Sequence, residues 1–186
     1  MPTRLKPKPA RGFSLIEVLV AMVVLAVGIV GAGAAQVAAL KTRHGTGLMS
    51  SGVQLAGALA DRMRANPAQM QAADSGNPYL QLHYDAEGGA PAAPAAMCYA
   101  GASCSSAQMA AFDVYEVTQA LYDQYPGARI VVCRDGTVWG GKALVWECAG
   151  GADAPVVIKL GWRGRKVDRE AGFAPAVAVV VAGGFE

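Results

Sequence analysis

The sequence predicts an α+β protein in which one long N-terminal helix packs on a C-terminal antiparallel sheet of about four strands. Three observations predict this fold class. Residues 18–35 carry no charged or hydrogen-bonding side chain, residues 48–65 continue with helical periodicity, and the last part of the chain holds four short segments rich in β-branched residues. The roughly 120 residues after the helix are enough for one hydrophobic core.

The chain opens with a basic leader, residues 1–12, that contains four basic residues and no acidic one: Arg4, Lys6, Lys8 and Arg11. The whole chain has 16 basic and 14 acidic residues, so removing the leader leaves 12 against 14 and changes the net charge from +2 to −2. The apolar run that follows crosses about 27 Å as a helix, close to the thickness of a bilayer core. We therefore predict that residues 13–40 are a transmembrane segment.

The charges on either side of this segment predict its orientation. Four basic residues precede it and only Lys41 and Arg43 follow closely, which places the N-terminus in the cytoplasm and residues 41–186 outside it. All four cysteines then lie in a compartment where disulfides form. The location expected before any assembly is the inner membrane.

Glu17 is the one charge in the first turns of the apolar helix, where a carboxylate is costly and marks a functional site. The segment Gly12-Phe-Ser-Leu-Ile-Glu17 resembles the processing site of type IV prepilins. The resemblance implies that a prepilin peptidase cleaves between Gly12 and Phe13 and methylates the new amino group of Phe13. The helix is then retained, first as a membrane anchor and later as the core of a filament.

Two different interpretations of this segment stay open. An ordinary secretory signal peptide would be cleaved near Ala32-Gly33-Ala34, although its apolar region is usually only about 7–15 residues long. A generic signal anchor would make Glu17 incidental. Either would leave Phe13 uncut.

Beyond the membrane segment, residues 48–65 form the amphipathic half of the long helix, and Gly45 and Gly47 are expected to bend or loosen it. Asn66-Pro67 ends it. Residues 66–97 are predicted to be irregular loop, and residues 106–125 a second helix that Ser106 caps. The predicted strands of the sheet, residues 128–182, are 128–134, 143–148, 156–162 and 175–182.

The four cysteines allow three disulfide connectivities, which the sequence alone does not separate. We favour Cys98–Cys104 as a tight local loop and Cys133–Cys148 as a link between neighbouring strands. Closing the second loop contributes about 3 kcal/mol by the chain-entropy estimate. A metal site is the rival interpretation, but no Cys-x-x-Cys spacing or nearby histidine favours it. We expect no cofactor.

Further stretches narrow the resemblance to PilV-type minor pilins. They are Asp61-Arg-Met-Arg-Ala-Asn-Pro67, Met97-Cys98, the helix bearing Asp113, Ile130–Asp135 and Val157–Trp162. The resemblance implies a pilin-like fold, a role in assembly and surface presentation of the pilus, and three kinds of partner besides the peptidase: other minor pilins, the major pilin and a PilY-type tip adhesin. It differs from many major pilins because its apolar helix lacks proline, so any local melting falls to Gly28, Gly31 and Gly33.

A basic cluster follows the third predicted strand: Arg163, Arg165, Lys166 and Arg169. Such residues contact phosphates in nucleic-acid complexes, and some minor pilins bind DNA during uptake. Asp168 and Glu170 dilute the charge, so a solvated turn is the better interpretation and nucleic acid is not the expected partner.

Two further classes of protein share part of this pattern. A type II secretion pseudopilin has the same N-terminus, and the sequence does not separate it from a pilus subunit. A membrane-anchored enzyme would also carry an apolar helix, but no nucleophile motif is present in the chain. We therefore expect a structural protein rather than an enzyme.

Overall fold

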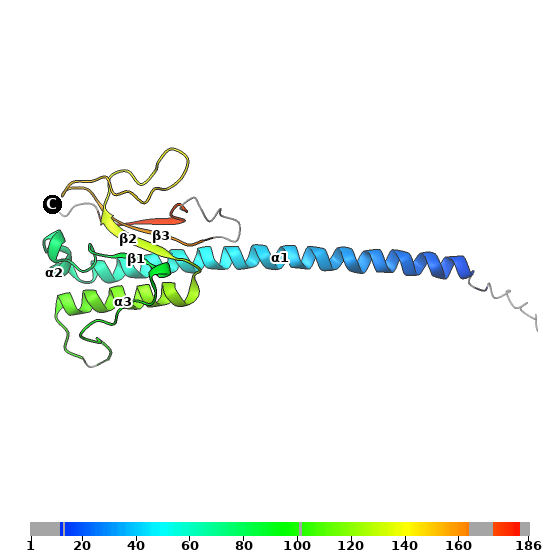
Figure 1. Cartoon of the computed structure of the whole chain (residues 1–186), viewed down its shortest axis with the longest axis horizontal. Coiled ribbons are helices and arrows are strands. Elements are labelled where there is room, and N and C mark those ends of the chain that lie inside the picture. Colours follow the sequence, from blue (N-terminus) through cyan, green and yellow to red (C-terminus); the bar gives the residue numbers. More distant parts are fainter. Residues whose placement is uncertain (1–11, 13, 101, 164–172, 183–186) are drawn as a thin grey trace, which may run out of the picture. The chain divides into compact units, whose positions relative to one another are not determined.

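A computed structural model describes residues 12, 14–100, 102–163 and 173–182. The chain divides into two compact units at Gly45/Thr46, so the longest helix contributes its first part to one unit and its last part to the other. The elements in chain order are α1 (Leu15–Arg64), α2 (Pro67–Met70), the 3₁₀ turn η1 (Asp74–Gly76), β1 (His83–Asp85), the 3₁₀ turn η2 (Ala86–Gly88), α3 (Ser106–Gln124), β2 (Arg129–Arg134), β3 (Val156–Gly161) and β4 (Val177–Ala182) (Figure 1).

The first part of α1 is apolar on every side. All side chains from Leu15 to Arg43 are exposed within the chain. Among the described residues, α1 is the one helix that is long and apolar enough to cross a membrane, judged by length and composition. A helix that is hydrophobic all round is stable only in an apolar surrounding, which a bilayer or a bundle of like helices supplies.

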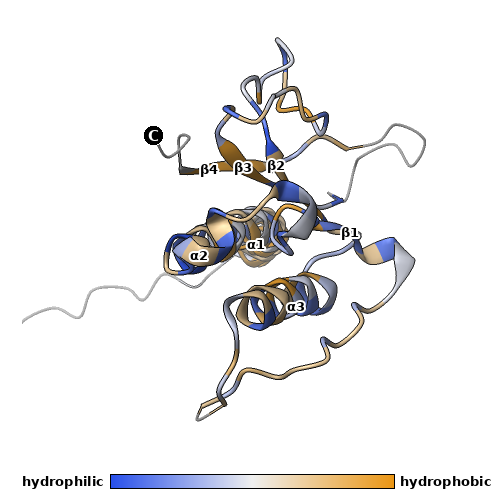
Figure 2. Cartoon of the chain, turned by 90° about the vertical axis from the view of Figure 1, so that its left-hand side faces the viewer, coloured by the Kyte–Doolittle hydropathy of each residue, from blue (hydrophilic) through white to orange (hydrophobic). Residues whose placement is uncertain are grey.

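The second unit is built in layers, with the last part of α1 between the sheet and α3 (Figure 2). The predicted apolar stripe of the helix packs as expected, because Leu59 and Met63 are fully buried and Leu48 and Leu55 pack against the core. Gly52 permits close contact with the strand end, since a Cβ there would lie 2.8 Å from the Trp162 ring. The core combines Ala56, Leu59, Ala60, Met63, Val117, Leu121, Ile130, Val132, Ile158 and Leu160.

The sheet has the order β1-β2-β3-β4, and all neighbouring strands are antiparallel. Opposite residues in the centre include Val132 with Ile158, and Val157 with Val180. The α+β class with a four-stranded antiparallel sheet is confirmed. Three predicted strands, 128–134, 156–162 and 175–182, correspond to β2, β3 and β4 with boundaries shifted by one or two residues.

The prediction of a strand at 143–148 is wrong. In that segment only an isolated bridge joins Leu144 to Trp139, across a narrow turn at Gly140-Gly141. The carbonyl of Glu147, which a strand would use in its ladder, instead accepts a hydrogen bond from the Lys159 ammonium. The segment's Leu144, Val145 and Trp146 suit a strand and equally a segment that covers a sheet, so these residue types did not separate the two.

The prediction that residues 66–97 are irregular loop is also wrong. This segment contains α2, η1, η2 and the fourth strand, β1, which pairs with the free edge of β2. Tyr79 and Leu82 are buried and fix the segment to the core. The sequence did not predict the strand β1, because three residues are too few to show the alternation of apolar and polar side chains that indicates a strand.

Two helix details also differ from prediction. The cap of α3 is Ser105 rather than Ser106: its hydroxyl accepts from the Gln108 N–H, and the Gln108 side chain accepts from the Ser105 N–H. The helix ends at Gln124 rather than Tyr125. Around Gly45 and Gly47, where loosening was expected, α1 keeps helical backbone.

Candidate functional site

The start of α1 holds the predicted processing site. The Ser14 carbonyl accepts hydrogen bonds from the Glu17 and Val18 N–H groups at 3.0 and 3.3 Å, so the helix begins directly after the motif. Gly12 is exposed, and Phe13, the predicted methylation site, lies outside the described residues. Glu17 is exposed in the first turn, where the helix dipole favours a carboxylate. It forms no ion pair with another described residue, so its charge is available to a partner.

The glycines of the apolar helix have open space around them with respect to the described part of the chain. A Cβ added at Gly28, Gly31 or Gly33 would meet nothing within 4 Å. These positions therefore contribute nothing to packing within the chain itself. Any packing role of the three glycines must involve another molecule.

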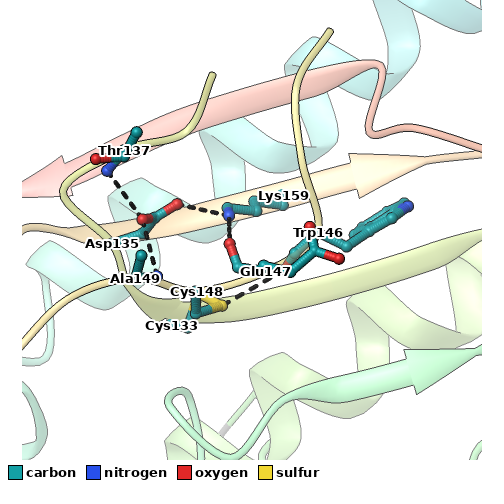
Figure 3. The surroundings of a disulfide bond; sticks show 8 residues. All are labelled: Cys133, Asp135, Thr137, Trp146, Glu147, Cys148, Ala149 and Lys159. Carbon is teal, nitrogen blue, oxygen red and sulfur yellow. Dashed lines mark hydrogen bonds and ion pairs between the residues drawn. A yellow bond between two sulfur atoms is a disulfide. The ribbon is translucent and has the colours of Figure 1, made fainter. Parts of the chain in front are cut away.

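The second unit contains two disulfides, Cys98–Cys104 and Cys133–Cys148. This pairing is the one favoured from the sequence. The first closes a short loop in which Tyr99 packs edge-to-face on Phe112 of α3, with ring centroids 5.0 Å apart. The second ties the end of strand β2 to the long β2–β3 connection, residues 135–155 (Figure 3).

Beside the second disulfide lies a buried ion pair. The Lys159 Nζ is 2.6 Å from Asp135 Oδ2, and the two side chains are 1% and 0% exposed. Lys159 also donates to the Glu147 carbonyl at 2.5 Å, and Asp135 Oδ1 accepts from the N–H groups of Thr137 and Ala149 (Figure 3). Asp135 Oδ1 thus accepts two backbone hydrogen bonds, whereas Asp135 Oδ2 is compensated by the ion pair with Lys159 alone.

The environment of Asp135 has opposing effects on its ionisation. Burial disfavours the charged carboxylate, but the hydrogen bonds from Lys159 and from the two N–H groups outweigh it and hold the pKa of Asp135 below its ordinary value. The carboxylate is therefore charged at neutral pH. The pair fixes both ends of the β2–β3 connection against the sheet.

Aromatic contacts cover the adjoining part of the sheet. The Trp146 indole N–H donates to the Phe173 carbonyl, the two rings pack edge-to-face, and the Arg129 guanidinium lies 4.7 Å from the centre of the Trp146 ring. Gly161 leaves the room for both rings, because a Cβ there would lie 3.1 and 3.2 Å from them. Trp146 is half-buried against the sheet, Trp162 is half-buried and packs against the core, and Trp139 is exposed.

The segment Asp61–Pro67 joins three elements at the end of α1. Arg62 reaches Asp113 and Glu116 of α3 at 3.1 and 2.5 Å, and Arg64 donates to two carbonyls of β4. Asn66 exchanges two hydrogen bonds with Ser106. The buried Asp113 also accepts from the Tyr79 hydroxyl, and burial followed by this hydrogen bond raises the pKa of Tyr79.

Two family models match the chain. One, described as the prokaryotic N-terminal methylation motif, matches residues 7–33, which include Gly12, Phe13 and Glu17. The other, described as type IV pilin Tt1218, matches residues 34–115. The chain is a type IV pilin. Comparisons with curated proteins and with solved structures found no significant match.

As a type IV pilin, the chain is a precursor whose role in pilus assembly is structural. It associates with other pilins and is processed by a prepilin peptidase. It is anchored in the inner membrane by its apolar helix before it enters the pilus.

The pilin's basic cluster is described only at Arg163, because Arg165, Lys166 and Arg169 lie outside the described residues. Arg163 forms an ion pair with Glu87 at 2.9 Å, and its guanidinium lies 5.9 Å from the centre of the Phe173 ring. This arginine is used inside the fold. Its contacts favour the structural interpretation of that position over phosphate binding.

Sequence reasoning missed the Lys159–Asp135 pair in this pilin. A signal was present: Lys159 is the one charged residue in the strand Val156–Gly161. A lysine in the middle of an apolar strand requires a buried acceptor. The acid directly after the preceding strand was the nearest candidate.

Proposed function

We propose that this chain is the precursor of a minor pilin. It joins other minor pilins and the major pilin in a complex that primes or caps the type IV pilus and presents a PilY-type tip adhesin. The observation that carries the proposal is the methylation motif ending at Glu17, which leads directly into the apolar first part of α1, where every side chain from Leu15 to Arg43 is exposed. Such a helix requires partners outside the chain.

Processing prepares the assembling end. The prepilin peptidase cuts between Gly12 and Phe13 on the cytoplasmic side and methylates the Phe13 amino group. That amine then stands at the positive end of the α1 dipole, where the Glu17 carboxylate of the same or an adjacent subunit offsets its charge. Between subunits this contact sets the register of one helix against the next.

The minor rather than major role is supported by the segment Asp61–Pro67, which resembles PilV-type minor pilins. In this chain it ties α1 to α3 and to β4. The segment therefore holds α3 and β4 against the end of α1 within the second unit. We expect surface presentation by a minor pilin to depend on this folded domain.

Mass spectrometry of sheared, purified pili tests the proposal. We expect the chain to be present in much smaller amounts than the major pilin and to begin with methylated Phe13. A Gly12→Val variant, as a matched control, should keep the leader and stay out of the pilus. A product starting near Ala35 would contradict processing at Gly12.

A deletion strain separates a pilus subunit from a type II secretion pseudopilin. Loss of the gene should reduce the number of surface pili and leave type II secretion intact. Normal piliation with defective secretion of folded enzymes would instead assign the chain to a secretion pseudopilus.

A role in DNA uptake is tested separately: the full-length chain in detergent should fail to bind duplex DNA at low salt.

A further inference from the structure

Among the strands of the described residues, β4 forms one edge of the sheet (Figure 2). Its six residues, Val177–Ala182, are all valine or alanine. An edge strand presents unpaired backbone groups to any other strand, and uncharged β-branched segments without proline are the most prone to such pairing. The opposite edge, β1, has only three residues and carries exposed His83 and Asp85. The two edges therefore need different protection.

At β4 the protection comes from Arg64 at the end of α1. Its Nε donates to the Val181 carbonyl at 2.7 Å, and its Nη2 donates to the Val180 carbonyl at 3.2 Å. Its remaining terminal nitrogen forms an ion pair with Asp61 at 2.7 Å, which holds the guanidinium in place. A strand arriving at this edge would have to displace these charge-assisted hydrogen bonds.

The strand is irregular at the same point. Val157 lies opposite Val180, whereas Val156 lies opposite Ala182, so Val181 is the extra residue of a β-bulge. Bulges at sheet edges disrupt the ladder and oppose further pairing. The bulge and the Arg64 contacts coincide at Val180 and Val181.

We propose that β4 is a latent pairing site for the β4 strand of a second copy of this chain, and that Arg64 keeps the site closed. A second copy fits because β4 has no charge along its length, so two antiparallel copies oppose no like charges. A two-fold axis would join the two sheets and leave neither β4 edge free.

Cross-linking of the full-length chain in detergent tests the proposal. Val180 is 53% exposed, and all four native cysteines are in disulfides, so Val180→Cys supplies a single free thiol. With a short bismaleimide, Val180→Cys alone should stay mostly monomeric. Adding Arg64→Ala removes both hydrogen bonds to β4 and should raise the cross-linked dimer at least tenfold, because the loss of even one hydrogen bond to a charged group has an effect of about that size.

Arg62→Ala is the matched control. Arg62 and Arg64 lie on the same helix with similarly exposed side chains, 42% and 46%, and both form ion pairs, but Arg62 makes no hydrogen bond to β4. Val180→Cys with Arg62→Ala should therefore remain monomeric. If Arg64→Ala fails to fold by circular dichroism, Arg64→Lys replaces it and should give an intermediate yield, because an ammonium lacks the fork that reaches both carbonyls. Equal yields with and without Arg64, or with either arginine removed, would overturn the proposal.

Discussion

The two parts of α1 belong to one helix but are stabilised differently. From Leu15 to Arg43 every side chain is exposed, whereas Ala56, Leu59, Ala60 and Met63 in the last part are fully buried against the domain's own core. The first part therefore takes its stability from a bilayer or from neighbouring helices, and the last part takes it from this chain. A substitution in the first part should change assembly without changing the stability of the domain, and one in the last part should do the reverse.

The largest expected effect comes from Glu17. If its carboxylate meets the Phe13 amine of a neighbour in the apolar filament core, Glu17→Gln leaves that amine unpaired at a cost of about 3–5 kcal/mol. Incorporation into pili, measured by immunoblot of sheared filaments, should then fall by at least tenfold. The free energy of unfolding of the second unit, measured by urea titration of the full-length chain in detergent, should stay constant. Normal incorporation would refute the assembly role of Glu17.

Substitution of Asp135, unlike that of Glu17, should lower the stability of the second unit. Asp135→Ala leaves the Lys159 ammonium buried and unpaired, which should lower the free energy of unfolding by about 3–5 kcal/mol. The control is Asp135→Leu with Lys159→Met, which removes both charges and should recover most of the loss. If the double variant is as unstable as the single one, the unpaired charge is not the cause.

Alanine substitutions at two glycines compare the first and last parts of α1 directly. Gly52→Ala places a Cβ 2.8 Å from the Trp162 ring and should destabilise the second unit by about 1–3 kcal/mol. Gly33→Ala meets nothing within 4 Å, so the same unfolding titration should show no loss. Its effect, if any, should be on incorporation into pili. Equal destabilisation by both substitutions would contradict the division of the helix.

The smallest expected effect is a pH dependence confined to the second unit. Because the folded-state pKa of Asp135 is depressed, its contribution to stability is complete above the unfolded pKa of about 4 and is lost as pH falls through the folded value. Thermal unfolding below about pH 4 should therefore show a loss of stability that is reduced in the Asp135→Leu/Lys159→Met double variant. An identical acid profile for both proteins would show that this carboxylate is not responsible.

Periodicity and composition predicted the parts of this fold that repeat along the chain. The apolar helix, the Leu59 and Met63 stripe and the valine-rich strands β2, β3 and β4 have long enough patterns to be recognised. β1 has three residues and forms because β2 offers it an edge, which no local pattern reveals. The segment 143–148 has strand composition but lies over the sheet, held there by Lys159.

The same contrast holds for the site residues. Gly12, Phe13 and Glu17 form a contiguous motif, so the sequence alone indicated them. The Lys159–Asp135 pair and the contacts of Arg64 with β4 join residues 24 and more than 100 positions apart in the chain. Such contacts depend on strand register and on the end of α1, which become visible only in three dimensions.

The Cys133–Cys148 bridge also affects what happens to a cleaved subunit. A protease that cut the chain anywhere from Gly136 to Glu147 would leave both new ends covalently attached, because the bridge spans the nick. The salt link at Asp135 and Lys159 would still hold the upstream end against the sheet. The exposed stretch of this connection around Trp139 is thus a place where the molecule tolerates a cut without releasing a fragment.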